Sequence, residues 1–210
     1  LQKAEAQARE AQIEVALERV RARTMAMQKS EELAEVAVLL YHELKALGLS
    51  QEFFECGYVE VDETNNIQRG WSTRPDGSFL EKPYYLPLTG EPVFDARYEA
   101  WSQRVPVFHQ AVGGDQVKQH TEYAIPYFVN KKAVEISTSS SLPDTIHFYC
   151  SNFDHGYLNI NCGIPLSAEE ESLLARFTRV FEMTYTRFLD LQRAEAQARE
   201  SQIQLALERV

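Results

Sequence analysis

Residues 145–162 read TIHFYCSNFDHGYLNINC, and this stretch decides the fold class. Alternating side chains over 145–152 and 156–162 predict two antiparallel strands joined by a turn at 153–155. In this register one face of the hairpin is aliphatic and carries Ile146, Phe148, Cys150, Leu158, Ile160 and Cys162. The opposite face is aromatic and polar and carries His147, Tyr149, Ser151, Tyr157, Asn159 and Asn161.

Further strands are predicted on both sides of this hairpin. Residues 53–62 alternate and are followed by a tight turn at 64–67 and a partner strand at 67–74, with Glu60 opposite Trp71. A turn at 75–78 leads to a possible strand at 79–88, and another is predicted at 133–138. The pattern therefore indicates a mostly antiparallel sheet of about six strands.

Helical patterns surround these strands. Residues 31–47 repeat leucines at helical spacing, 91–104 begin with a proline in the first turn, and Ser167 caps a long C-terminal helix. Residues 107–128 are mixed, with room for a second short helix. The order of elements predicts an α+β fold with the terminal helices on one face of the sheet.

The two faces of this sheet are expected to differ in role. We expect the aliphatic face, with Val59, Val61, Phe148, Cys150, Leu158 and Ile160, to pack on the terminal helices. The segment 91–128 would then cover the other face, and the predicted ligand-binding residues are Tyr58, Glu60, Trp71, Trp101, His109, His147, Tyr149 and Asn159. The alternative is that this face is simply solvated.

A repeat flanks the central part of the chain. Residues 1–20 (LQKAEAQAREAQIEVALERV) and 191–210 (LQRAEAQARESQIQLALERV) are identical at 16 of 20 positions. The conservative differences indicate divergence, although an artificial duplication remains an alternative. We predict a linker helix at 1–29, a domain at 30–190 and a second linker helix at 191–210, as one unit of a tandem array in a longer protein.

Apolar residues in both flanks follow a coiled-coil spacing. The predicted dimer seam comprises Ile13, Leu17, Val20 and Met27 at one end, and Phe181 and Phe188 at the other. This pattern favours a parallel homodimer. The alternative is an amphipathic helix that packs on its own domain.

Composition and motifs exclude several classes of function. A net charge of -10 argues against binding to nucleic acid or to an anionic membrane, and no apolar run is long enough to span a bilayer. Three cysteines without framework spacing favour a cytoplasmic location. No phosphate-binding loop, nucleophile elbow or standard metal-ligand spacing is present, and we predict neither a catalytic nor a metal site.

The chain resembles a GAF-type sensory domain of a bacterial signalling protein. The resemblance rests on the element order over 30–190 and on the ending GIPLSAEEESLLARFTRVFEMTYTRF at 163–188. The segment ALERVRARTMAMQKSEELAEVAVLLYHEL at 16–44 is similar to linkers between the sensory domains of histidine kinases. The resemblance implies a six-stranded antiparallel sheet, a ligand pocket roofed by the middle helices and parallel dimerisation through the terminal helices.

Two ligand classes of that family are disfavoured. Asn130-Lys131 is not followed by the Phe and Asp-Glu positions of cyclic-nucleotide binders, and Cys56, Cys150 and Cys162 are not followed by histidine as in many bilin binders. The cofactor is therefore unknown. The leading hypothesis is a non-catalytic sensory module that binds a small ligand and signals through its helices to an effector. A ligand-free dimerising spacer is the alternative, and an enzyme is the least favoured hypothesis.

Overall fold

The computed structural model describes residues 2–49, 53–73, 83–127 and 143–208. One antiparallel sheet of six strands forms its centre, in the order β3-β2-β1-β6-β5-β4. The strands are β1 (Phe53–Asp62), β2 (Ile67–Thr73), β3 (Tyr84–Pro87), β4 (Val107–Gly113), β5 (Thr145–Phe153) and β6 (Gly156–Cys162). The central pair β1 and β6 comes from opposite halves of the chain, and long-range pairing therefore holds the sheet together.

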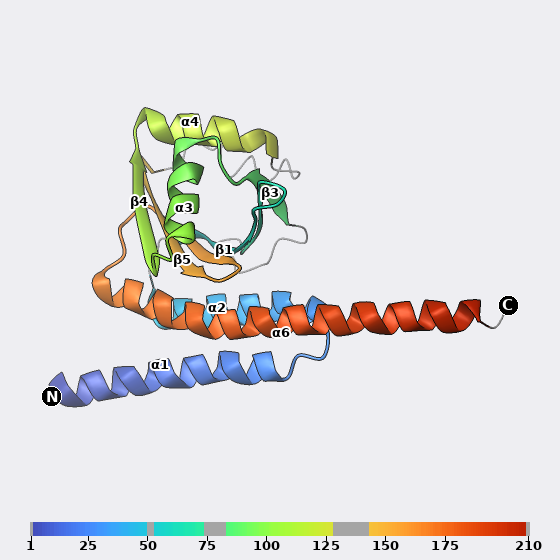
Figure 1. Cartoon of the computed structure of the whole chain (residues 1–210). Coiled ribbons are helices and arrows are strands. Elements are labelled where there is room, and N and C mark those ends of the chain that lie inside the picture. The colour runs from blue at the N-terminus through green and yellow to red at the C-terminus, as the bar shows by residue number, and fades with distance from the viewer. Residues whose placement is uncertain (1, 50–52, 74–82, 128–142, 209–210) are drawn as a thin grey trace.

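Helices cover both faces of the sheet (Figure 1). One face packs on α2 (Leu33–Ala46) and α6 (Ala168–Leu207), and α1 (Gln2–Met25) lies against the outer side of these two helices. A 3-10 turn, η1 (Ser30–Glu32), separates α1 from α2. The other face is covered by α3 (Pro92–Ser102) and α4 (Asp115–Ala124), followed by a second 3-10 turn, η2 (Ile125–Tyr127). The molecule thus has four layers: α1, α2 with α6, the sheet, and α3 with α4.

The α+β class and the six-stranded antiparallel sheet are confirmed, and one of the six strands was not predicted. Residues 107–113, expected to be mixed, form the edge strand β4, which pairs with β5. The strand predicted at 133–138 and the turn at 75–78 lie outside the described residues. Within the described residues, no helix is both long and apolar enough to cross a bilayer.

The predicted orientation of the last hairpin is wrong by one residue. The turn contains only Asp154 and His155, because Phe153 is still part of β5 and pairs with Gly156. Tyr149 therefore lies opposite Ile160, where the predicted register places Phe148. Because side chains alternate along a strand, this slip moves every β5 side chain to the opposite face.

The assignment of residues to the two faces changes accordingly. Of the six residues expected to pack on the terminal helices, Leu158 and Ile160 do so. The other four pack on the side of α3 and α4: Val59, Val61, Phe148 and Cys150. In the β1–β2 hairpin, Glu60 pairs with Arg69 rather than Trp71, a shift of two residues that leaves the faces unchanged.

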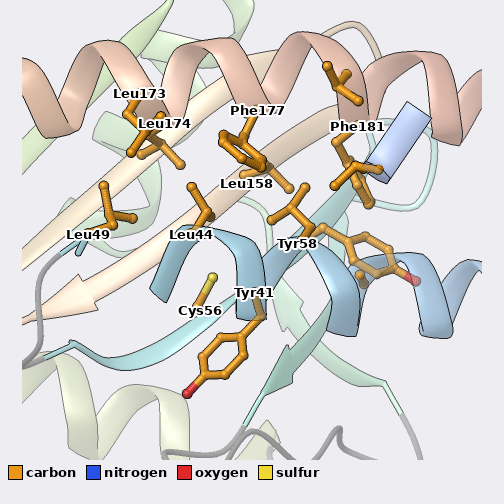
Figure 2. Close-up of a cluster of buried hydrophobic side chains, with 14 of the residues drawn as sticks. Tyr41, Leu44, Leu49, Cys56, Tyr58, Leu158, Leu173, Leu174, Phe177 and Phe181 are labelled. Atoms are coloured by element: carbon orange, nitrogen blue, oxygen red, sulfur yellow. The ribbon is translucent and has the colours of Figure 1, made fainter. Parts of the chain in front are cut away.

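The predicted dimer seam is buried inside the single chain. Ile13, Leu17, Val20, Met27 and Phe181 are all at most 5% exposed, in one cluster with α2 and the sheet, and Phe188 packs on it. Figure 2 shows the α6 members Leu174, Phe177 and Phe181 directed toward α2 and β1. The alternative of an amphipathic helix packed on its own domain is therefore the arrangement that this chain adopts.

Polar contacts fix α1 against α6 in parallel. The buried hydroxyl oxygens of Thr24 and Thr184 lie 2.5 Å apart, and Arg176 donates to Glu10 at 2.8 Å and to Glu14 at 2.7 Å. Residue numbers increase together along the two helices, so both run in the same direction (Figure 1). The coiled-coil spacing seen in the two flanks thus serves an intrachain helix pair.

Candidate functional site

The most unusual buried group is the guanidinium of Arg97, between the sheet and α3. Arg97 belongs to the sheet-facing side of α3 together with Val93, Phe94 and Trp101, and it is 9% exposed. Its guanidinium carbon lies 4.2 Å from the centre of the Phe148 ring. Such a cation–π contact offsets part of the cost of burying the charge.

Hydrogen bonding leaves this guanidinium incompletely satisfied. Among the described residues, the Nε and Nη2 atoms of Arg97 have no hydrogen-bond partner, although Tyr157 interacts with the side chain. A buried donor without an acceptor costs about 1–3 kcal/mol, and more when the group is charged. Two such donors in one interior make Arg97 the centre of the candidate site.

Polar side chains from four strands form a hydrogen-bond network next to Arg97. The carboxylate of Glu55 on β1 accepts from Ser72 at 2.5 Å and from the Asn161 amide at 2.6 Å. The Tyr84 hydroxyl also donates to it, at 3.4 Å. Glu55 is thus held by neutral donors, and among the described residues no carboxylate forms an ion pair with Arg97.

Tyr84 reaches this network because β2 has no side chain at Gly70. The Tyr84 ring lies over Gly70, where a Cβ atom would meet the ring at 2.0 Å. On the other side of the network, Tyr157 donates a short hydrogen bond to Gln68. The interior is therefore a built polar cluster, defined by Glu55, Gln68, Ser72, Tyr84, Arg97, Tyr157, Asn159 and Asn161, which we term the Arg97 cluster.

The charge state of this cluster follows from burial and from its neighbours. Burial opposes the charged form of Arg97, but nearby acidic groups, Glu55 among them, raise its pKa overall, and the guanidinium stays charged. Burial raises the pKa of Tyr84 and Tyr157 far above the ordinary value, so both hydroxyls stay protonated at neutral pH. The cluster thus holds the positive charge of Arg97 beside the carboxylate of Glu55.

A second polar pair sets the start of α3. Glu91 caps the helix, accepting from the backbone of Val93 at 3.0 Å and of Phe94 at 3.2 Å, and its carboxylate lies 3.0 Å from Nδ1 of His120 on α4. Burial and the charge of Arg97 lower the pKa of His120 to about 4, although Glu91 acts in the opposite direction. At neutral pH His120 is therefore neutral and donates to Glu91.

Two of the eight predicted ligand-binding residues lie on this side of the sheet. Trp101 is buried, with its indole nitrogen 2.9 Å from the carbonyl of Phe153. Asn159 is part of the Arg97 cluster, and its Oδ1 has no partner among the described residues. It lies opposite Cys150 on β5, whose thiol interacts electrostatically with Arg97.

The other six predicted residues lie on the face that packs on the terminal helices. Tyr58 stacks on Trp71 with ring centres 4.9 Å apart and also contacts Phe181 of α6. Glu60 forms an ion pair with Arg69 at 3.0 Å. The expectation that Tyr58, Glu60 and Trp71 lie under 91–128 is therefore wrong.

The remaining three form a stack at the edge of the same face. His109 lies parallel to Tyr149 with ring centres 4.3 Å apart, and its Nε2 is 2.9 Å from Nδ1 of His147. Burial, followed by the neighbouring His147, lowers the pKa of His109. Tyr149 is buried and its hydroxyl accepts from the backbone of Leu166. The stack joins the edge of the sheet to the start of α6, apart from the Arg97 cluster.

The cysteines do not have the properties of reactive thiols. Burial raises the pKa of Cys56 to about 12 and the pKa of Cys150 and Cys162 to about 11. All three are buried and protonated at neutral pH, whereas nucleophilic cysteines have a lowered pKa. In the described part of the chain, no three His, Cys, Asp or Glu side chains gather as metal ligands do.

The sequence contains one signal for the Arg97 cluster, in the helix at 92–102. Val93, Phe94, Ala100 and Trp101 mark the apolar side of the helix at 92–102, and Arg97 falls in the middle of it. A charged residue on a buried helical face is rare unless it has a partner. The partners Glu55, Ser72 and Asn161 could not be found in the same way, because they depend on the register of three strands.

The comparisons with known proteins concern the fold. No family model matches the sequence, and no curated protein matches it. Among solved structures, the chain is similar to the GAF domain of an Acinetobacter phosphoenolpyruvate-protein phosphotransferase, with 12% identity over 84% of this chain and 92% of that one, at a TM-score of 0.45. It is similar to a free methionine-R-sulfoxide reductase from Neisseria meningitidis, with 16% identity over 87% and 91% of the two chains, at 0.46. A structure described as a GAF domain gives 12% identity over 84% and 88%, at 0.47.

Proposed function

We propose that this chain is a sensory or regulatory module of the GAF type, which binds a small anionic molecule at the Arg97 cluster. The observation that carries the proposal is the buried guanidinium of Arg97, with two N–H groups that have no acceptor among the described residues. The antiparallel sheet of six strands and the covering helices α3 and α4 agree with what the family resemblance implies.

The chemistry of the cluster selects the ligand class. A carboxylate or phosphate oxygen would satisfy Nε and Nη2 of Arg97 together, because the guanidinium presents its donors in a planar fork. The unpartnered Oδ1 of Asn159 calls for an N–H or O–H donor. A small molecule with an anionic group and a donor group, such as an amino acid or a hydroxy acid, meets both requirements.

The sheet links the Arg97 cluster on one face to α6 on the other, and ligand binding could be transmitted to α6 along this path. The Arg97 cluster draws on β1, β2, β3 and β6, and Phe148 of β5 contacts Arg97. The opposite face of β1, β5 and β6 packs on α2 and α6. Thr178 of α6 donates to the Ser151 hydroxyl of β5 at 2.7 Å, a buried polar link between sheet and helix. A ligand that shifts these strands would thereby move α6, which extends beyond the domain (Figure 1). The shift is limited by the difference in ligand affinity between the two states.

A thermal-shift panel of amino acids, hydroxy acids and phosphate esters tests the proposal on three chains. They are the wild type, Arg97→Met and, as a control, Arg104→Met, whose exposed guanidinium pairs with Asp154 just after α3. A ligand should stabilise the wild type and Arg104→Met. Loss of hydrogen bonds from a charged donor should weaken its binding to Arg97→Met by roughly 10- to 100-fold.

Two results would contradict the proposal. Equal stabilisation of Arg97→Met would place the ligand elsewhere. A wild type that no member of the panel stabilises would favour the alternative function, a ligand-free spacer held by the packing of α1, α2 and α6.

A further inference from the structure

The C-terminal part of α6 repeats a helix that the domain itself buries. Residues 191–208 continue α6 past the body of the domain (Figure 1), and their sequence matches that of residues 1–18 at an offset of 190. In α1 this sequence packs on α2 and on the first half of α6. We refer to the surface that α1 covers as the α1 site, and to residues 191–208 as the tail.

The four differences between the two repeat copies all fall on the solvent side of α1. Lys3, Ala11, Glu14 and Val15 are replaced in the second copy, and each of them is exposed. The buried residues of the first copy, Ile13, Ala16, Leu17 and Val20, are all retained. Within the repeat, the second copy has therefore kept the apolar side chains that α1 buries in the α1 site.

In this chain the tail side chains that correspond to Ile13 and Leu17 are not buried against a helix or the sheet. Ile203 is 56% exposed and Leu207 is 71% exposed, whereas their counterparts Ile13 and Leu17 are 5% and 2% exposed. Leu205 is also exposed, but it lies on the opposite side of the helix, as its counterpart Val15 does in α1. An exposed apolar stripe on an otherwise polar helix is typical of a surface that binds a partner.

We propose that the tail of one copy of this domain occupies the α1 site of a second copy. In such an arrangement α6 of one domain and α1 of the next are a single helix, so a movement of α6 directly changes the packing of the following domain. The proposal is independent of the ligand at the Arg97 cluster.

The polar contacts of the α1 site are also compatible with the tail. Arg9 donates to the carbonyl of Leu47 and pairs with Glu169, and its counterpart Arg199 is retained. Arg176 pairs with Glu10 and Glu14, whose counterparts are Glu200 and Gln204, so one of these two ion pairs is lost. Exposed ion pairs contribute little to stability, and this loss does not prevent docking.

The polar contact between the tail and Ser30 of its own domain does not interfere. Glu195 accepts from the backbone and the hydroxyl of Ser30 in its own chain, at 2.9 and 2.7 Å. Its counterpart in α1 is Glu5, which is exposed and therefore not needed in the α1 site. One helix can thus hold Ser30 of its own domain and enter the α1 site of the next.

The spacing of neighbouring domains follows from the length of the helix. Arg176 binds Glu10 in this chain, and the counterpart Glu200 lies 24 residues farther along α6. At 1.5 Å per residue this places the next domain about 36 Å along the helix axis. Because the contact is head-to-tail and does not close on itself, association grows with concentration instead of stopping at a dimer.

The test uses the full chain with the α1 site vacated. In wild type the tethered α1 has a high effective concentration and excludes the tail of another molecule. In Ile13→Glu/Leu17→Glu, α1 should leave the site and the tail of a second molecule should enter. Analytical ultracentrifugation should then show an average mass that roughly doubles or more as the concentration rises, beyond any change in wild type.

Matched substitutions in the tail separate docking from unspecific association. Adding Ile203→Glu/Leu207→Glu to the vacated chain should return the mass to the wild-type value. Association that persists in this fourfold variant, or no association in the vacated chain, would overturn the proposal. A lower mass for Ile203→Glu/Leu207→Glu alone, relative to wild type, would also overturn it, since the tails would then pair with each other.

A second variant keeps the proposal testable if the vacated chain does not fold. Lys3→Arg/Ala11→Ser/Glu14→Gln/Val15→Leu gives α1 the sequence of the second copy. We expect its melting temperature to stay within about 2 °C of wild type, since exposed substitutions change stability little. A markedly lower melting temperature, or proteolytic release of residues 1–25, would show that the second-copy sequence does not fit the α1 site.

Discussion

Acidification should destabilise this fold through His120. The side chain is 9% exposed, and burial together with Arg97 lowers its pKa from 6.5 to about 4. In the unfolded chain His120 takes up a proton near pH 6.5, whereas in the folded chain it does so only near pH 4. Between these values the unfolded state binds more protons, so the stability that neutral His120 contributes is complete above pH 6.5 and is lost as the pH falls toward 4.

The size of the effect follows from the two pKa values. Proton linkage gives a loss of about 2 kcal/mol between pH 7 and pH 5 from this one histidine. The measurement is urea-induced unfolding at both pH values for the wild type and for His120→Gln. The wild type should lose about 2 kcal/mol more than the variant over this interval, because glutamine does not titrate.

A control variant at a second histidine and an NMR titration of His120 test this prediction further. As a control, His42→Gln replaces an exposed histidine on α2. Equal losses in the wild type and His120→Gln would refute the reasoning. An NMR titration that gives His120 an ordinary pKa would also refute it. Burial and the charge of Arg97 would then not act on His120 as the structure indicates.

Three further predictions test other parts of the structure. Arg97→Met should raise the pKa of His120, measured by NMR, because the charge of Arg97 helps to lower it; an unchanged value would place that charge elsewhere. Leu17→Ala should lower the free energy of unfolding by about 2–4 kcal/mol, whereas the repeat counterpart Leu207→Ala should change it by less than about 0.5 kcal/mol, and equal effects would contradict the packing of α1. Ser167→Ala removes the capping box of α6 and should cost about 1 kcal/mol in chemical denaturation, unless the helix begins elsewhere.

The sequence was sufficient for the element order because most elements have strong local signals. The helix at 31–47 has regular leucines, the helix at 91–104 has its proline, and Ser167 with Glu170 forms the predicted N-terminal cap. Strands β1, β2, β5 and β6 alternate visibly. The strand at 107–113 lacks such a signal, because an edge strand with exposed His109 and Ala111 has little reason to alternate.

The choice of sheet face was beyond the sequence, because for β5 it depended on one turn residue and for β1 on its long-range pairing with β6. Placing Phe153 in the turn instead of the strand reversed every side chain of β5 relative to β6. The signals that could have corrected it are Tyr58 and Tyr149, which are large enough to fill the space under α6. Both faces of this sheet are covered by helices, so apolar side chains occur on each, and the aliphatic character of a face does not identify its partner.

The repeat is plain in the sequence, but its packing partner is found only in the structure. From the sequence alone, 191–210 and 1–20 are two similar linker helices, and the seam at Ile13 and Leu17 favours a dimer. Only the packing of α1 shows that these residues fill a site on their own domain, and that Ile203 and Leu207 are left exposed. The sequence identifies the pattern, and the structure identifies its partner.

The central claim is that the Arg97 cluster holds a small anionic molecule. Native mass spectrometry of the wild type, Arg97→Met and Arg104→Met chains, purified in parallel from the same cells, tests it most directly. We predict a reproducible extra mass on the wild type and on Arg104→Met that is absent from Arg97→Met. A wild-type chain without any extra mass, or the same extra mass on Arg97→Met, would contradict the claim.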